Sequence, residues 1–315
     1  MTTTLKGVNS LADTDLSQLL SANFIMFLDW GLLDKGGFAS VRLGDSNIHS
    51  ADRSKLRLSD DPDYSAGRVW ETFHQNLVWE SGVSVANQPI NISGVYVNNS
   101  FKPTSGTGPY AHHVEYTTGR VVFDSGIATS STVKMEYSYK TISVVEAKDY
   151  PLLREVQFRI GDPYSNGFTQ TGSGEYNKSP NNRISLPLIG VEVTPRVSST
   201  PHEMGSAAAR THTTILLHVL GENDSIVKKL VSILTKQKEN TIWLLDMDMM
   251  ARSGAFPLDY LGVKSANPQI YPSLANENGY RYYKTYILEA QGTNGDWVSN
   301  NLYHGVTQLT TETIL

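Results

Sequence analysis

The residues of this 315-residue chain that most readily suggest metal or acid–base chemistry are two adjacent histidines, His112 and His113. They begin the segment "HHVEYTTGRVVFD", in which two β-rich runs are separated by the residues TTG. A three-residue loop with glycine in the left-handed backbone region is a common hairpin connection, so Gly119 is expected to have a positive φ. The register of such a hairpin pairs His112 with Asp124, Val114 with Val122 and Tyr116 with Arg120. Because successive strand residues point to opposite faces, the two histidines cannot bind one metal ion, and the segment is predicted to be a structural hairpin.

Two further groups of residues have side chains of the kind that bind cations. Asp246 and Asp248 in "DMD" would share one face of a strand, but no further oxygen ligands follow at the spacing that Mg²⁺ or Ca²⁺ requires. His212 and His218 would lie about 20 Å apart on one strand at about 3.3 Å per residue, and His202 precedes that strand. We interpret all of these as ordinary surface or core residues.

The motifs that recur in enzymes are missing from the sequence. The glycine-containing segments 106–108 and 172–175 lack a strand–loop–helix context and the Lys-Ser/Thr pair of a phosphate-binding loop. There is no G-x-S-x-G nucleophile motif, H-E-x-x-H metal motif or kinase motif set. The sequence therefore predicts no catalytic, cofactor-binding or metal-binding residue, no cofactor and no enzyme activity.

Composition excludes several classes of function. The chain has 26 basic and 31 acidic residues, a net charge of −5, which argues against nucleic-acid binding as the main function. It has no cysteine, so disulfides, thiolate zinc sites and cysteine nucleophiles are excluded. No signal peptide is visible, and the longest apolar run, "LLSANFIMFLDWGLLDKGGF", is interrupted by Asn23 and Asp29, so no membrane span is expected.

The N-terminal quarter of the chain, residues 1–75, is predicted to be a helix followed by a polar loop. Asp13 or Thr14 can cap the helix, which "DKGGF" ends. The apolar positions with helical spacing are Leu16, Leu19, Leu20, Phe24 and Phe27. This helix is more apolar than a one-sided surface helix needs, so it is either a core helix or a helix that contacts another subunit. Residues 45–75 are polar and irregular, as expected for a loop or linker.

Residues 76–160 are predicted to form a β-rich module. Short β-favouring runs are separated by Gly, Pro, Asn and Ser, which predicts a small sandwich or barrel. The run "STVKMEYSYKTISVV" alternates between apolar and polar residues from Val133 to Lys140, as a single antiparallel strand with one buried face would.

Residues 161–315 are predicted to form an α+β domain with long loops at 161–183 and 199–211. The segment "ENDSIVKKLVSILTKQKEN" has the periodicity of a helix capped by Asn223 or Asp224. Strands are expected at "ISLPLIGVEVTPRV", "THTTILLHVLG", "TIWLLDMD", "RYYKTYILEAQG" and "GVTQLTTETIL". The nearly continuous apolar run of "TIWLLDMD" predicts a central strand, and the last segment is expected to be an ordered strand. The predicted fold class is α+β: an apolar N-terminal helix, a β-rich sandwich- or barrel-like middle module, and a helix on a sheet of four or five strands.

Three parts of the sequence resemble structural proteins of tailed bacteriophage virions. They are "FIMFLDWGLLDKGGF", the strand and hairpin pattern of "GVYVNNSFKPTSGTGPYAHHVEYTTGRVVFDSGIATSSTVKMEYSYKTISVV", and the strand–helix–strand segment "ILLHVLGENDSIVKKLVSILTKQKENTIWLLDMD". The last is similar in type to head-to-tail connector and tail-terminator proteins. The resemblance implies a non-enzymatic virion protein, assembled in the host cytoplasm. It would form a homo-oligomeric ring with neighbouring neck or tail proteins, through which DNA passes without specific binding, and no membrane would be involved.

A carbohydrate-binding or carbohydrate-cleaving β-protein is the alternative function, beside a tail or baseplate component of the same virion. Its aromatic platform would be Trp70, Trp79, Trp297 and the tyrosines. Exposed rings with two carboxylates about 5–10 Å apart would favour a glycosidase, whereas buried rings and extended contact surfaces would favour the virion protein.

Overall fold

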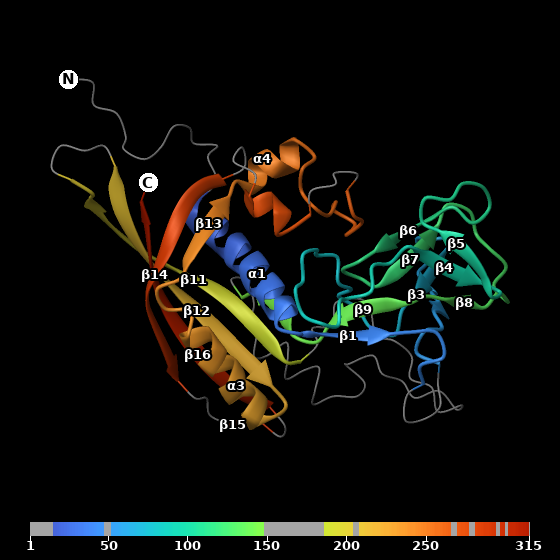
Figure 1. Ribbon diagram of the computed structural model, residues 1–315, viewed down its shortest axis with the longest axis horizontal. Helices are drawn as coiled ribbons and strands as arrows, with labels where there is room; N and C mark the ends of the chain where they lie inside the picture. The colour runs from blue at the N-terminus through green and yellow to red at the C-terminus, as the bar shows by residue number, and fades with distance from the viewer. Residues whose placement is uncertain are drawn as a thin grey trace. The chain divides into compact units, whose positions relative to one another are not determined.

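The computed structural model describes residues 15–46, 52–147, 186–203, 208–265, 270–276, 281–293, 297–299 and 302–314 (Figure 1). The fold class is α+β and mostly strand, as the sequence predicts. The chain divides into two compact units: unit 1 is 1–29, 142–250 and 275–315, and unit 2 is 30–141 and 251–274. Each unit combines segments that lie far apart in the sequence.

The predicted N-terminal helix is α1 (Leu16–Asp34), and it passes from unit 1 into unit 2. Leu20 and Phe24 are fully buried, which explains the apolar character of the helix. The helix ends where Gly36 adopts a φ of +85°, a conformation that favours glycine. The two residues proposed as caps, at positions 13 and 14, lie outside the described residues.

Asn23 interrupts the apolar face of α1 for a structural reason. It is 3% exposed, its amide nitrogen donates to the Leu245 carbonyl at 3.1 Å, and its amide oxygen accepts from the Leu245 N–H at 2.8 Å. The side chain thus replaces a neighbouring strand at the edge of the sheet in unit 1. By length and composition alone α1 could cross a membrane, so Asn23 and Asp29 do not make this segment too polar for a span. Its buried side chains and the Asn23 bonds are those of a core helix.

Unit 1 is built on a seven-stranded sheet with the order β10-β11-β12-β16-β14-β13, and β15 also pairs with β16. The strands are β10 (Ser143–Glu146), β11 (Leu188–Pro201), β12 (Ala209–Gly221), β13 (Thr241–Leu245), β14 (Arg281–Thr293), β15 (Trp297–Ser299) and β16 (Leu302–Ile314). β10 is parallel to β11 and the other pairs are antiparallel. The sheet is therefore larger than the four or five strands expected.

The position of β13 in the sheet corrects one prediction, and the structure of β16 confirms another. β13 was expected to be central, but it is the edge strand beside β14. Its continuous apolar run was misleading, because Leu244 and Leu245 are fully buried although β13 is an edge strand, and Asn23 of α1 bonds to the free backbone edge at Leu245. β16 contains the last segment of the chain, which is an ordered strand as predicted, and it lies between β12 and β14.

The two faces of this sheet differ in what covers them. Helix α3 (Asp224–Thr235), capped by Asn223 as expected, packs against β12, β14 and β16 (Figure 1). A Cβ on Gly305 would lie 2.7 Å from Val231 of α3, so this glycine permits the close approach. We call the face that carries Gly305, Leu309 and Thr311 the inner face. The opposite, outer face carries the alternate residues of β12 and β16, which are partly exposed.

Unit 2 is rich in strands and, within the described residues, contains three small sheets. They are β1 (Phe38–Val41) with β9 (Tyr137–Lys140); β2 (Arg57–Leu58), β3 (Val69–Glu71), β7 (Arg120–Phe123) and β6 (His112–Glu115) in that order; and β5 (Ser100–Pro103), β4 (Gly94–Val97) and β8 (Val133–Lys134) in that order. The segment 45–75, predicted to be a loop, therefore contains two short strands. Polar residues dominate it because both strands are short and their hairpin loop is exposed.

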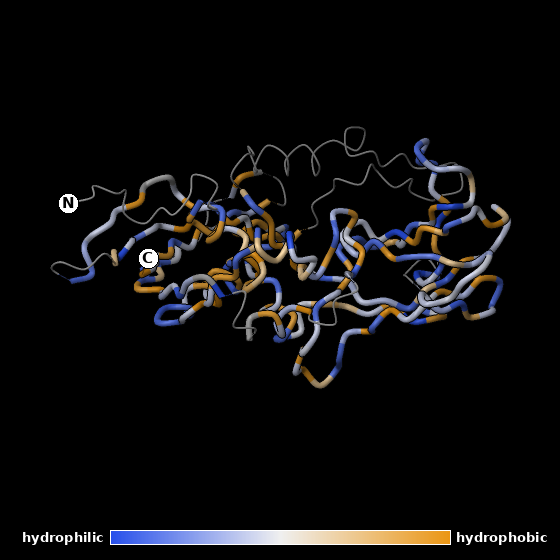
Figure 2. Tube along the Cα trace, turned by 90° about the horizontal axis from the view of Figure 1, so that it is seen from above, coloured by the Kyte–Doolittle hydropathy of each residue, from blue (hydrophilic) through white to orange (hydrophobic). Residues whose placement is uncertain are grey.

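The run from Val133 to Glu146 is three strands rather than the one predicted. β8, β9 and β10 each belong to a different sheet. The expected alternation fails at Ser138 and Lys140, which are buried at 0% and 5% exposure where solvent-facing residues were expected. The hydropathy-coloured trace shows apolar and polar residues alternating along many strands (Figure 2), a pattern that does not reveal where one strand ends and the next begins.

Candidate functional site

The histidine segment forms the predicted hairpin, but its register is shifted by one residue. His112 lies opposite Phe123 rather than Asp124, and Glu115 lies opposite Arg120. The loop has four residues because the Gly119 N–H donates to the Glu115 carbonyl at 2.9 Å, which ends β6 one residue earlier than expected. Gly119 has a φ of +69°, as predicted.

The two histidines occupy adjacent positions of β6 and so point to opposite faces, as expected. His112 is 5% exposed, and its Nδ1 lies 2.8 Å from the Tyr110 carbonyl oxygen. Burial lowers the pKa of His112, and its ring packs 5.3 Å from that of Phe123. These contacts are those of a neutral core histidine.

Replacing Gly119 by Ala is expected to destabilise the protein by about 2–3 kcal/mol. The left-handed backbone conformation costs roughly 1 kcal/mol for a residue with a Cβ, and that Cβ would overlap the carbonyl oxygen of His74 at 2.6 Å. Gly36 is the matched control, because it also has a positive φ but nothing lies within 4 Å of its Cβ position. Urea unfolding should show a clearly larger loss for Gly119→Ala than for Gly36→Ala, and equal losses would contradict the packing argument.

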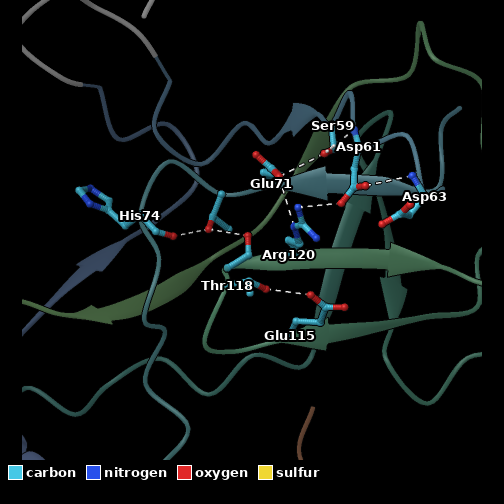
Figure 3. Close-up of polar contacts among 10 residues, drawn as sticks. Ser59, Asp61, Asp63, Glu71, His74, Glu115, Thr118 and Arg120 are labelled. Atoms are coloured by element: carbon cyan, nitrogen blue, oxygen red, sulfur yellow. Dashed lines mark hydrogen bonds and ion pairs between the residues drawn. The ribbon is translucent and has the colours of Figure 1, made fainter. Parts of the chain in front are cut away.

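A polar network in unit 2 joins the β2–β3 hairpin loop to β7 (Figure 3). The Arg120 guanidinium contacts the carboxylate of Asp61 at 3.0 Å and that of Glu71 at 3.3 Å. Ser59 donates to Glu71 at 3.1 Å, and the Asp63 N–H donates to Asp61 at 3.1 Å. Because both carboxylates are bound to one cation, the arrangement clamps the loop rather than providing a general acid and base.

The "DMD" segment does not lie on a strand as predicted. β13 ends at Leu245, and Asp246 precedes helix α4 (Met247–Arg252), where its carboxylate accepts from the Met249 N–H at 2.9 Å. Asp248 lies within that short helix, so the two aspartates do not share a strand face. Capping preference, which the sequence interpretation did not consider at this position, explains Asp246.

Three histidines of β12 and β16 take part in cross-strand contacts on the outer face. His212 of β12 lies directly opposite Glu312 of β16, with Nε2 3.0 Å from the carboxylate. His218 of β12 contacts Glu192 of β11 at 2.8 Å and His304 of β16 at 3.2 Å. Sequence reasoning missed these groups because the partners are 26 to 100 residues apart. His202 is half-buried, and its Nδ1 accepts a hydrogen bond from Arg210 at 2.9 Å.

Large apolar side chains are exposed together at the β13–β14–β16 end of the outer face. We call Trp243, Tyr286 and Ile314 the outer patch; they are 43%, 37% and 46% exposed. The cations of Arg281 and Lys284 lie 4.7 and 5.4 Å from the Trp243 ring. A shallow depression of about 260 Å³ beside them is lined by Thr241, Lys284, Tyr286, Glu312 and Ile314. Such a surface combines an apolar centre with charged groups around it, as protein interfaces do.

No group of three or more His, Cys, Asp or Glu side chains within the described residues is arranged to hold a metal ion. No protein-family model matches the chain, and neither a curated protein nor a solved structure gives a significant match. The candidate site is therefore defined by the geometry of the outer face alone.

Proposed function

We propose that this chain is a non-enzymatic structural protein of a tailed-phage virion that assembles as a ring at the head-to-tail neck or in the tail. Its partners are further copies of itself and neighbouring neck or tail proteins. DNA passes through the ring without specific binding, and no membrane takes part. The proposal rests on the resemblance of the sequence and, in the structure, on the outer patch.

The outer patch supports self-assembly because it leaves apolar surface in water. Trp243, Tyr286 and Ile314 are each more than a third exposed and come from three adjacent strands of one sheet. Clustered exposed apolar residues with a polar border typically mark a protein contact surface. Covering them by another copy would remove this surface from water, at about 25 cal/mol per Å² of apolar area.

The alternative carbohydrate-binding function needs exposed aromatic rings. Of the tryptophans named for it, Trp70 and Trp79 are 3% and 9% exposed. The Trp70 indole N–H donates to the Gly67 carbonyl at 3.0 Å, and the Lys140 ammonium lies 5.3 Å from the Trp79 ring. Trp297 is 64% exposed. Two of the three rings are thus part of the core of unit 2, which favours the structural protein.

Sedimentation velocity of the purified protein over a roughly hundredfold range of concentration tests this proposal. We expect a concentration-dependent oligomer that Trp243→Ser weakens at least about tenfold, because truncation of a central aromatic residue in an interface typically costs about 2 kcal/mol or more. Tyr260→Ser is the matched control, since Tyr260 is 94% exposed and lies in unit 2. A wild-type oligomer that Trp243→Ser and Tyr260→Ser affect equally would contradict the role of the outer patch.

A further inference from the structure

The imidazoles of His218 and His304 face each other on the outer face of the sheet. Nδ1 of His218 lies 3.2 Å from Nε2 of His304, and the two rings are inclined by only 12°. The rings belong to the adjacent strands β12 and β16, so the sheet holds them side by side. The His218 side chain is 23% exposed, which leaves the pair accessible to solutes.

The hydrogen bonds determine which ring nitrogens carry a proton when both imidazoles are neutral. Glu192 lies 2.8 Å from Nε2 of His218 and accepts the proton of that nitrogen. In the neutral ring Nδ1 of His218 then carries a lone pair, and the proton between the two rings belongs to Nε2 of His304. Neutral imidazoles are good ligands for transition metals.

We infer that His218 and His304 form a binding site for a divalent transition-metal ion of the zinc, nickel and copper class. Two imidazole nitrogens bound to one tetrahedral zinc ion, at about 2.0–2.1 Å each, lie roughly 3.3 Å apart. The observed separation of 3.2 Å needs only a small rotation of the rings. On binding, the proton of His304 moves through solvent from Nε2 to Nδ1, so the ring stays neutral and both facing nitrogens donate lone pairs to the metal.

Glu192 has a defined part in this site. It does not face the gap between the imidazoles but holds the other nitrogen of His218, and carboxylates in this position orient metal-binding histidines and raise their basicity. Water completes the coordination, because no third suitable side chain joins the pair within the described part of the chain. The metal would connect β12 to β16 and, through Glu192, to β11.

Titration of the whole 315-residue chain with ZnCl₂ alone, monitored by calorimetry and by thermal unfolding, tests the site. We expect one zinc ion bound per chain and a rise in Tm, since a ligand that binds only the folded state stabilises it. His304→Asn should abolish both effects, and Glu192→Gln should weaken binding about 10- to 100-fold. His212→Asn is the matched control, because His212 of β12 is also paired with a glutamate, Glu312 of β16, but contacts no second imidazole in the described part of the chain.

Two results would overturn the inference. Zinc binding that is the same in wild type and His304→Asn would place the metal elsewhere, and failure of the wild type to bind would remove the site. If His304→Asn has an altered Tm without metal, the NMR signals of the His218 ring in the wild type, which should shift on adding zinc, decide the question. The site does not depend on the proposed ring assembly.

Discussion

A chain that ends at Gly305 is expected not to form the seven-stranded sheet of unit 1. The deletion removes most of β16, which pairs with β12 on one side and with β14 on the other. It also removes Leu309, Thr311 and Thr313, which are at most 1% exposed. Loss of a central strand exposes two new strand edges and the apolar inner face, so the shortened chain should aggregate or remain unfolded.

Circular dichroism and limited proteolysis of the truncated chain measure this effect, with a chain lacking only Leu315 as the control. The control should unfold like the full-length protein. Hydrogen exchange gives a second test on the intact protein. Rapid exchange of the amides from Val306 to Thr313 would show that β16 is not a stable central strand.

The second large effect is expected at a buried ion pair in unit 2. The Lys140 ammonium contacts the Glu80 carboxylate at 2.5 Å, and the two side chains are 3% and 1% exposed. Lys140→Met should destabilise the protein by about 3–5 kcal/mol, because removing one partner of a buried pair leaves the other charge poorly compensated. Chemical denaturation at neutral pH measures the loss.

Lys35→Met provides the matched control, since Lys35 pairs with Asp34 but its side chain is 81% exposed. Its removal should leave stability nearly unchanged, as for most surface ion pairs. The double variant Glu80→Gln, Lys140→Met should recover part of the loss because no buried carboxylate then lacks its cation. Equal stabilities of Lys140→Met and Lys35→Met would show that burial of the pair is energetically unimportant.

Local sequence patterns predicted the fold class and its longer elements correctly. Helical spacing located α1, the Asn223 cap located α3, and a β-favouring composition located β16. These signals depend on residues close together in the chain. The same kind of signal located Gly119 at a turn.

The sequence-based predictions were wrong or incomplete where contacts between distant residues determine the structure. The hairpin register depends on one backbone bond from Gly119 to Glu115, and the edge position of β13 depends on Asn23 of a distant helix. The pairing of His218 with His304 depends on which strands are neighbours in the sheet. Hydrophobic periodicity carries no information on that order, so the outer face could not be assembled from the sequence.

A cryo-electron microscopy map of the assembled particle tests the central claim most directly. The proposed function predicts rotationally related copies of this chain in a closed ring at the neck or tail, with Trp243 and Ile314 covered by a neighbouring copy. A map in which the chain occurs as isolated copies, without rotationally related neighbours in contact, would contradict it.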